Sequence, residues 1–419
     1  MKPPPNLLRR IAEEVGTPVY VYDARTIRKN FNELTGSLGG IPHRIHYSVK
    51  ANSNLSILRL MRELGAGADI VSGGELVRVR ESGFVGSDIV FSGVGKTGAE
   101  LGAALDANVG LINVESSSEL QLLSDIADER AASAHFGVRV NPDVATDTHP
   151  YTQTGERGMK FGVPLADVLD LVEWSTSREN LDFCSLGVHI GSQIMDAGHY
   201  RDAAERLVAL VDEIAASGMP APRSLGMGGG LGVGYVDDTR LDPAAFAEAV
   251  RPLWEASGLP ITIEPGRFLV GNAGWILTRC IRCKQSGRRK FAVVDAAMND
   301  FLRPSLYGAQ HRISVVGAGP ESDGNRYDVV GPVCETGDFL GTDQKLPGLM
   351  PGALLAISGA GAYGFTMSST YNSRPRVAEV MADGNRWAIV RERECVRDLM
   401  RGEAVSDDQL CWETYDEGK

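Results

Sequence analysis

Eight short apolar segments, rich in β-branched residues and spread over the first two thirds of the chain, constrain its fold more than any other feature. Stretches with helical periodicity, such as 54–64, 200–216 and 243–254, separate most of them. Apolar strands that alternate with helices are typical of a parallel sheet, and eight such units over about 230 residues favour a (β/α)8 TIM barrel, an α/β fold. The eight segments lie at 45–49, 68–71, 89–92, 111–114, 136–140, 186–190, 224–227 and 261–264.

An open doubly wound sheet is the alternative α/β arrangement for this pattern. Such a sheet usually has fewer strands and carries a glycine-rich turn after its first strand. The first of the eight segments is followed instead by Lys50-Ala51-Asn52. The barrel is therefore favoured.

The pattern changes after Gly271, where short strand-like segments follow one another with few long helical stretches between them. This indicates a second, mostly β domain, in keeping with a length of 419 residues, which exceeds the usual size of one domain. A short strand-like segment at 18–22 precedes the barrel, and we expect it to join the second domain. The expected division is a barrel at 27–270 and a C-terminal β domain at 271–419 that includes 1–26. The later strand segments lie at 291–295, 313–316, 327–330, 354–358, 377–381 and 387–390.

The chain is acidic, with a net charge of −12 and a pI near 5.2. This argues against nucleic acid or an anionic membrane as a partner. No run approaches the roughly 20 apolar residues of a membrane span, and the charged N-terminal stretch lacks the apolar core of a signal peptide. We therefore expect a cytoplasmic protein that acts on a small molecule.

The six cysteines form no disulfide framework, and we expect free thiols. Cys280 and Cys283 are the only close pair, in a segment at 275–283 that looks like a strand. Residues three apart on a regular strand point to opposite faces, so we do not expect this pair to share a metal ion or a redox function. The sequence predicts no metal site.

Chemically versatile residues follow four of the barrel strands at their carboxyl ends. Lys50 follows the first strand, His189 ends the sixth, three glycines at 228–230 follow the seventh, and Glu264 ends the eighth. In a TIM barrel these ends form one rim, where active sites lie and where phosphate binds near the last two strands. We therefore predict an active site at this rim.

Lys50 is the most informative of these residues. Burial lowers the pKa of a lysine, and the neutral amine forms Schiff bases with aldehydes, pyridoxal phosphate among them. The alternative is a lysine whose side chain reaches solvent from the end of a strand. Its position on the same rim as the glycine run and Glu264 favours the reactive amine.

The other residues of the rim also allow two interpretations each. The glycine run either brings backbone N–H groups close to a phosphate or is a flexible loop. Glu264 either faces the ring nitrogen of pyridoxal phosphate or pairs with Arg267. His189 either stacks on the cofactor ring or is a hydrogen-bonded core residue.

Polar groups also gather in turns of the second domain, at 295–307, 331–338 and 361–372. Cys334 lies in one of these turns, and from its residue type alone a small buried hydrophobic side chain is the simplest interpretation.

Together these motifs resemble the diaminopimelate decarboxylases, in order, from about residue 17 to the last strands. Single motifs are shared with ornithine and arginine decarboxylases, whereas the combination is specific. The resemblance implies an alanine-racemase-like (β/α)8 barrel with a C-terminal β domain, pyridoxal 5′-phosphate as cofactor, and a homodimer in which Cys334 and Glu335 reach into the partner subunit's active site. The motifs are Tyr47-Ser48-Val49-Lys50-Ala51-Asn52, His189-Ile190-Gly191-Ser192-Gln193, the glycines at 228–230, Glu264-Pro265-Gly266-Arg267, Cys334-Glu335-Thr336-Gly337-Asp338 and the segment 363–371.

The resemblance also implies a role for each matching residue. Lys50 tethers the cofactor, His189 stacks on its ring and Cys334 donates a proton, which makes these three the expected catalytic residues. Glu264 faces the pyridinium nitrogen. The other cofactor contacts implied are Ser192, Gly230, Pro265, Gly266, Arg267 and Tyr363, and the substrate contacts implied are Arg267, Arg303, Tyr307, Glu335 and Tyr363.

The implied reaction is the decarboxylation of meso-2,6-diaminopimelate to L-lysine and CO2, the last step of lysine biosynthesis. Arg303 and Glu335 offer the cationic fork and the anion that the distal carboxylate and ammonium of this substrate require. Two alternatives remain. One is a related decarboxylase of ornithine, lysine or a carboxylated polyamine, and the other is a non-catalytic, decarboxylase-like protein that binds pyridoxal phosphate.

Overall fold

Eight parallel strands close into a barrel in the computed structural model, which describes residues 3–144, 155, 158–237, 239–318, 325–404 and 406. Each strand pairs with the next one around the barrel, and the pairs β2–β10 and β5–β6 complete the ring. The predicted TIM barrel is thereby confirmed. Its strands are β2 (His43–Ser48), β3 (Gly67–Ile70), β4 (Ile89–Phe91), β5 (Leu111–Val114), β6 (Ala134–Asn141), β8 (Leu181–Val188), β9 (Ser224–Gly226) and β10 (Ile261–Ile263), and the two-residue β7 (Val163–Pro164) pairs with β6.

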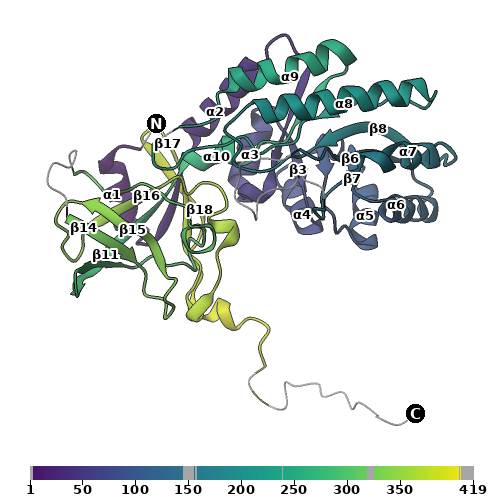
Figure 1. Cartoon of the computed structure of the whole chain (residues 1–419). Helices are drawn as coiled ribbons and strands as arrows, with labels where there is room; N and C mark the ends of the chain where they lie inside the picture. Colours follow the sequence, from purple (N-terminus) through teal and green to yellow (C-terminus); the bar gives the residue numbers. More distant parts are fainter. Residues whose placement is uncertain are drawn as a thin grey trace.

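Helices surround the barrel strands, because each buries one apolar face against the sheet (Figure 1). Capping residues define several helix ends. Thr97 and Glu100 form a capping box at the start of α5. Asp242 caps the start of α9, and Gly258, in a left-handed conformation, terminates this helix. None of the described helices is long and apolar enough to cross a membrane. These helices are α2 (Ala24–Ser37), α3 (Leu55–Glu63), α4 (Gly73–Glu81), α5 (Gly98–Asp106), α6 (Ser117–Glu129), α7 (Val168–Thr176), α8 (Gly198–Ala216), α9 (Pro243–Ser257) and α10 (Arg267–Val270).

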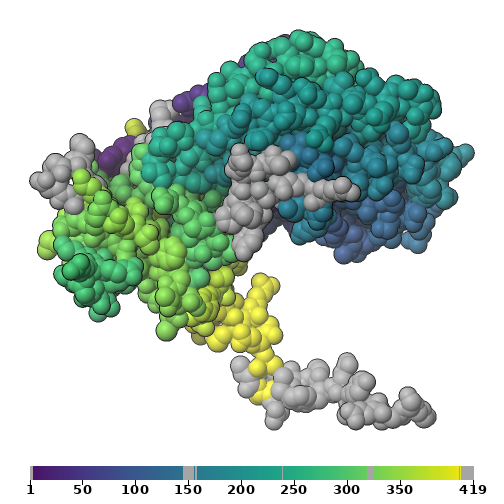
Figure 2. All heavy atoms as spheres, viewed as in Figure 1, coloured from purple at the N-terminus to yellow at the C-terminus, as the bar shows by residue number. Residues whose placement is uncertain are grey.

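A mostly β domain follows the barrel, as predicted, and its sheet includes the first strand of the chain. β1 (Val19–Asp23) pairs antiparallel with β11 (Gly274–Ser286) and parallel with β17 (Ala378–Asp383), so early and late segments lie side by side. Figure 2 shows this domain and the barrel as adjoining masses. The domain also contains α1 (Pro5–Glu14), β12 (Arg289–Val294), α11 (Arg303–Tyr307), β13 (Ile313–Val315), β14 (Asn325–Val330), β15 (Phe339–Leu346), β16 (Leu354–Ser358) and β18 (Arg386–Arg391).

One local feature of this domain contradicts the sequence-based expectation. Cys280 and Cys283 do not point to opposite faces of β11, because their sulfur atoms lie 3.7 Å apart. A β-bulge between Cys280 and Arg282 adds one residue to the strand and shifts the alternation of its side chains. The described cysteines are free thiols, as expected, whereas Cys411 lies outside the described residues.

Candidate active site

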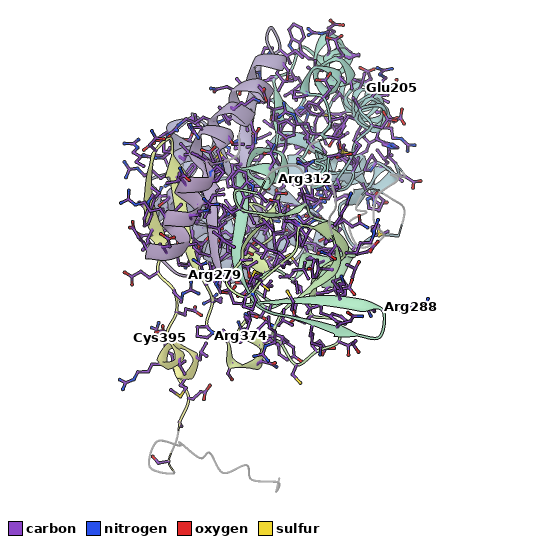
Figure 3. The ribbon with its side chains drawn as sticks, turned by 90° about the vertical axis from the view of Figure 1, so that its left-hand side faces the viewer. Glu205, Arg279, Arg288, Arg312, Arg374 and Cys395 are labelled. Carbon is purple, nitrogen blue, oxygen red and sulfur yellow. The ribbon has the colours of Figure 1, made fainter. Side chains whose placement is uncertain are left out.

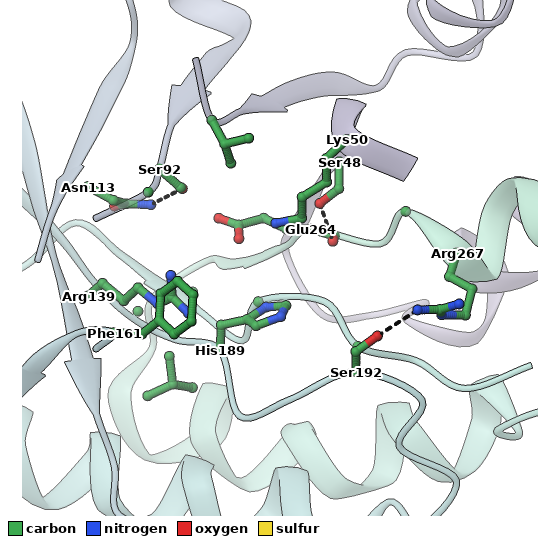
Figure 4. Close-up of a pocket in the computed structure, with 18 of the residues that line it drawn as sticks. Ser48, Lys50, Ser92, Asn113, Arg139, Phe161, His189, Ser192, Glu264 and Arg267 are labelled. Carbon is green, nitrogen blue, oxygen red and sulfur yellow. Dashed lines mark hydrogen bonds between the residues drawn. The ribbon is translucent and has the colours of Figure 1, made fainter. Parts of the chain in front are cut away.

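The carboxyl ends of the barrel strands surround a cavity of about 650 Å³ that is also lined by residues of the β domain. Figure 4 shows Lys50, Glu264 and His189 around one space, with Arg139 on one side of it and Arg267 on the other. The structure thus brings together most residues that the sequence singles out. These are Lys50, His189, Ser192, Gly230, Glu264, Gly266, Arg267, Arg303, Tyr307 and Tyr363.

Lys50 lies in a 3-10 helix, η1 (Val49–Ala51), that directly follows β2. Its Nζ atom is 3.9 Å from Oδ2 of Asp69, a buried carboxylate on β3. Burial lowers the pKa of Lys50, but the surrounding negative groups, Asp69 foremost, raise it by more, so that the net pKa is above its ordinary value. The expectation of a lysine made neutral by burial is therefore wrong for the ligand-free protein, in which Lys50 is an ammonium group beside Asp69.

Glu264 is a second carboxyl group at this end of the barrel and directly follows β10. Burial, followed by repulsion from Asp69, raises its pKa to about 8. The alternative pairing with Arg267 is not what the structure shows. Arg267 donates hydrogen bonds to Tyr235 Oη at 2.6 Å and to Ser192 Oγ at 2.9 Å. The charge of Lys50, which contacts Asp69, opposes this rise in the pKa of Glu264 without cancelling it.

His189 follows β8 and lines the same cavity. The backbone N–H of Gly229 donates to its Nδ1 atom at 3.1 Å, so the neutral ring carries its proton on Nε2. Burial, assisted by the charge of Lys50, lowers the pKa of the ring well below its ordinary value. His189 therefore presents a neutral aromatic ring at physiological pH.

The glycine run after β9 is a tightly packed turn. Gly228 and Gly230 have φ values of +62° and +90°, which other residues rarely adopt. A Cβ atom at Gly230 would clash with the carbonyl oxygen of Gly191, and one at Gly229 would clash with that of Glu264. The loops after three strands therefore meet through their backbones, and backbone atoms border this part of the cavity.

The turn after β10 is fixed to the end of β2. The carbonyl of Pro265, a residue that does not line the cavity, accepts the N–H of Ser48 at 3.3 Å, and the carbonyl of Glu264 accepts the Ser48 hydroxyl at 2.9 Å. A Cβ atom at Gly266 would lie 2.8 Å from Cβ of Ala51. Only glycine lets this turn pack so closely against η1.

Two buried arginines border the cavity on the side of the β domain. The guanidinium of Arg267 lies 4.6 Å from the ring centre of Tyr363, and that of Arg303 lies 5.1 Å from Tyr235 and 5.6 Å from Tyr307. The Nε atom of each arginine is buried without a hydrogen-bond partner. Buried cations that have aromatic neighbours and unused donors suit an anionic ligand.

Three residues of the site were missed by the sequence analysis: Asp69, Arg139 and Tyr235. Asp69 carried a readable signal, because an acidic residue inside a short apolar strand needs a partner. Arg139 lies within β6 and donates to Glu115 at 2.9 Å. Tyr235 lies in an irregular loop, where no periodic pattern indicates the direction of a side chain.

Cys334 and Glu335 are not brought to this cavity. Both are exposed, so the interpretation of Cys334 as a buried hydrophobic side chain is wrong. The N–H of Cys334 donates to Asn372 Oδ1 at 2.8 Å, and the Tyr371 hydroxyl lies 3.3 Å from Glu335.

One group of potential metal ligands, His135, Asp182 and Cys184, lies at the amino ends of β6 and β8. Arg223 donates two hydrogen bonds to Asp182, at 2.9 and 2.6 Å. A guanidinium therefore already neutralises the only carboxylate of the group, and we assign no metal to it.

A parallel barrel with a lysine after its first strand, a carboxyl group after its last and packed glycine turns on the same rim fits a pyridoxal-dependent enzyme. Residues 24–271 match the family model for the pyridoxal binding domain of pyridoxal-dependent decarboxylases. The diaminopimelate decarboxylase of Vibrio cholerae is 45% identical over 400 residues, which are 95% of each chain. The chain belongs to the diaminopimelate decarboxylase family.

Solved structures agree with this assignment. The diaminopimelate decarboxylase of Helicobacter pylori, complexed with L-lysine, has a TM-score of 0.90 and 38% identity, covering 94% of this chain and 98% of that one. A lysine/ornithine decarboxylase from Vibrio vulnificus, with 19% identity and a TM-score of 0.79, covers 90% of this chain and 97% of its own and shares the fold.

The cofactor of the protein is pyridoxal 5′-phosphate, and the residues present fit it. Lys50 offers an amine for the aldehyde group. The buried carboxyl group of Glu264, whose pKa is raised to about 8, would be stabilised in its ionised form by a protonated ring nitrogen. Backbone atoms of the glycine turns border the cavity where a phosphate can approach closely.

Proposed function

We propose that this protein decarboxylates meso-2,6-diaminopimelate to L-lysine and CO2 with pyridoxal phosphate. One observation carries the proposal: a single cavity is lined by Lys50, which contacts the buried Asp69, by Glu264, and by two buried guanidiniums that pair with no carboxylate of the described chain. The first set suits the cofactor, and the second suits a substrate that has two carboxylates. The Helicobacter pylori relative was solved with L-lysine, the product of this reaction.

We assign the cofactor contacts as follows. Bound pyridoxal phosphate supplies an electron sink for the charge that remains on the substrate when CO2 departs. Lys50 would tether it, His189 would lie against its ring, and Glu264 would face its ring nitrogen. The remaining cofactor contacts that we propose are Ser192, Gly230, Pro265, Gly266, Arg267 and Tyr363.

The side chains of the protein hold and move protons in this scheme. Asp69 positions the amine of Lys50. Glu264, ionised when the protonated ring nitrogen of the cofactor is bound, would keep the proton on that nitrogen. The thiol of Cys334 donates the proton that the substrate's α-carbon gains. The aromatic wall of Tyr235, Tyr307 and Tyr363 excludes water.

The proposed role of Cys334 requires a second subunit. Cys334 and Glu335 are exposed and outside the cavity of their own chain, which supports a homodimer in which they complete the partner's site. Glu335 would then bind the distal ammonium of the substrate, with Arg303 on the distal carboxylate and Arg267, Tyr307 and Tyr363 as further contacts.

Arg303 offers a test of substrate selectivity. We predict that Arg303→Ala raises KM for diaminopimelate at least about tenfold, because a carboxylate then loses a charge-assisted partner worth roughly 1.5–3 kcal/mol. Steady-state kinetics measure the effect. Arg288→Ala, at the exposed tip of the β11–β12 hairpin, is the matched control and should leave KM unchanged (Figure 3). Equal KM values for the two variants would contradict the assignment.

The decisive experiment follows CO2 release from meso-diaminopimelate, ornithine and lysine, with and without added pyridoxal phosphate. We expect release from diaminopimelate alone, dependent on the cofactor. Faster release from ornithine or lysine would favour a related decarboxylase. A visible absorption band that shifts with diaminopimelate while no CO2 appears would identify a non-catalytic binder.

Two further expectations belong to this proposal. We propose that the barrel domain comprises 27–270 and that the β domain comprises 271–419 together with 1–26. We also propose that the enzyme works in the cytoplasm, a compartment in which proteins rarely contain structural disulfides, in keeping with the free thiols of its described cysteines.

A further inference from the structure

We propose that Cys280 and Cys283 form an oxidation site, at which a small-molecule disulfide converts the two thiols into a reversible intrachain disulfide. Their sulfur atoms lie 3.7 Å apart in the reduced protein. Among the five cysteines that the structure describes, this is the only pair of thiols within hydrogen-bonding distance. The proposal concerns a part of the β domain that the decarboxylation does not use.

A β-bulge creates the pair. Cys280 lies opposite Val294 of β12, whereas Cys283 lies opposite Ala292, so one residue of β11 between them has no partner on β12. On a regular strand, residues three apart would point to opposite faces. Val294 and Ala292 are two residues apart on β12 and therefore point to the same face of the sheet. Because of the extra residue in β11, Cys280 and Cys283 point to this face as well.

The backbone around the pair is held in place. The N–H of Cys280 donates to the carbonyl of Ala353 at 2.9 Å, and the N–H of Gly352 donates to the carbonyl of Cys280 at 2.8 Å. The thiol of Cys283 lies 3.6 Å from the carbonyl of Leu349. The Cys283 thiol therefore lies at the turn between β15 and β16 with the Cys280 thiol beside it, and a disulfide forms when the two sulfur atoms approach from 3.7 Å to about 2.05 Å.

The two thiols differ in solvent exposure, and this difference determines which of them reacts first. Cys283 is exposed, whereas Cys280 is 2% exposed. Burial raises the pKa of Cys280 to about 12, so its thiol stays protonated until a neighbour reacts. Cys283 is the attacking thiol, and Cys280 is the resolving one.

The exchange balances in two steps. The Cys283 thiolate attacks one sulfur of the small disulfide, whose sulfur–sulfur bond breaks and releases one small thiol. Cys280 then gives up its proton and attacks the Cys283 sulfur, which forms the protein disulfide and releases the second small thiol. Two protein thiols are oxidised and one small disulfide is reduced to two thiols.

A shared metal ion is the competing use of two neighbouring thiols. Structural sites for thiophilic metals usually take four ligands. Within the described residues, the only group of three or more potential ligands is His135, Asp182 and Cys184, which does not include this pair. Oxidation therefore fits the pair better than metal binding.

The experiment treats the cofactor-loaded full-length protein with oxidised glutathione in the absence of oxygen and metal ions, and then blocks the remaining thiols. Trypsin cuts after Arg279, Arg282 and Lys284, so the proposed disulfide joins the peptides Cys-Ile-Arg and Cys-Lys in one species of unambiguous mass. We expect this species to become the main product at these positions and to disappear on treatment with dithiothreitol.

Serine variants separate the two roles. Cys280→Ser should retain one glutathione on Cys283, whereas Cys283→Ser should take up none at Cys280. Cys395→Ser, which alters another exposed thiol, should still form the linked peptides. Glutathione that persists on Cys283 of the unaltered protein, a link to a different cysteine, or no change at either position would each overturn the proposal. Since no residue of β11 lines the active-site cavity, CO2 release should stay within about twofold after oxidation.

Discussion

At the scale of single residues, burial keeps a proton on the carboxyl group of Glu264 in the ligand-free cavity. Burial, followed by repulsion from Asp69, raises the pKa of Glu264 to about 8, although the charge of Lys50 opposes the shift. In the unfolded chain this carboxyl group has its ordinary pKa of 4.5. At a pH between 4.5 and about 8, the folded protein holds a proton on Glu264 that the unfolded chain has released. The free energy of unfolding therefore decreases as the pH rises through this range.

We therefore expect the ligand-free protein to lose stability relative to Glu264→Gln as the pH rises from about 5 to about 8, by on the order of a few kcal/mol. Urea unfolding of both proteins at each pH measures the difference. The comparison removes the opposite trend of His46 and His311, whose pKa values burial lowers to about 3 in both proteins. A stability difference that does not vary with pH would contradict the charge assignment.

Tyr235 connects the two buried arginines and is a positioning residue for both. Its hydroxyl accepts from Arg267 at 2.6 Å, and its ring lies between Arg303, at 5.1 Å, and His311, which stacks on it at 4.4 Å. We predict that Tyr235→Phe lowers kcat/KM about tenfold through KM, because one buried donor loses its acceptor at a cost of roughly 1–3 kcal/mol.

Tyr235→Leu separates the hydroxyl from the ring. It removes the cation–π contact with Arg303 as well as the hydrogen bond, so its KM should exceed that of Tyr235→Phe. Both variants should keep the absorption band of the bound cofactor. Equal kinetics for the two variants, or a loss confined to kcat, would show that Tyr235 does not position the arginines.

The sequence identified the residues at strand ends far better than those in loops. Lys50, His189 and Glu264 were predictable, because the end of a parallel strand has a known place in a barrel. The charge state of Lys50 could not be predicted, since it depends on Asp69 of a neighbouring strand. The exposed position of Cys334 also required the structure.

At the scale of elements, the glycine turn after β9 is the most constrained part of the rim. We predict that Gly230→Ala lowers the free energy of unfolding by about 1–3 kcal/mol more than the same substitution at a glycine with positive φ and open space around it. The reason is that the added Cβ atom would clash with the Gly191 carbonyl. The affinity for pyridoxal phosphate should also fall. Urea unfolding and a cofactor titration measure the two effects.

Gly218→Ala is the matched control for this prediction. Gly218 has a φ of +69° but no atom within 4 Å of an added Cβ, so it isolates the backbone preference, worth roughly 1 kcal/mol. If Gly230→Ala were no more destabilising than Gly218→Ala, packing would not explain the turn.

Most elements could be predicted because apolar strands and amphipathic helices carry strong periodic signals. All eight barrel strands are found within a few residues of their expected positions. β15 was missed, since its sequence Phe-Leu-Gly-Thr-Asp-Gln-Lys-Leu is largely polar, and its pairing with β14 is a long-range property. The bulge in β11 likewise depends on its partner strand and leaves no mark in its own sequence.

At the scale of the whole molecule, the proposed homodimer makes a quantitative prediction. Lys50→Ala and Cys334→Ala should each be inactive alone. Mixed after unfolding and refolding, they should recover about a quarter of the wild-type activity, because half of the dimers are mixed and each of these has one intact site. Turnover of the refolded mixture measures this. No recovery, with mixed dimers confirmed by mass spectrometry, would place both residues in one subunit's site.

The position of β1 has a consequence for how the protein is made. This strand is synthesised before the barrel, yet its partners, β11 and β17, both follow the barrel in the sequence. The barrel can therefore assemble during translation while the backbone groups of β1 still lack their partner strands. Completion of the β domain, which carries Arg303, must therefore follow the synthesis of β17. Chaperones that shield exposed strand edges should consequently act on the N-terminal segment of the nascent chain.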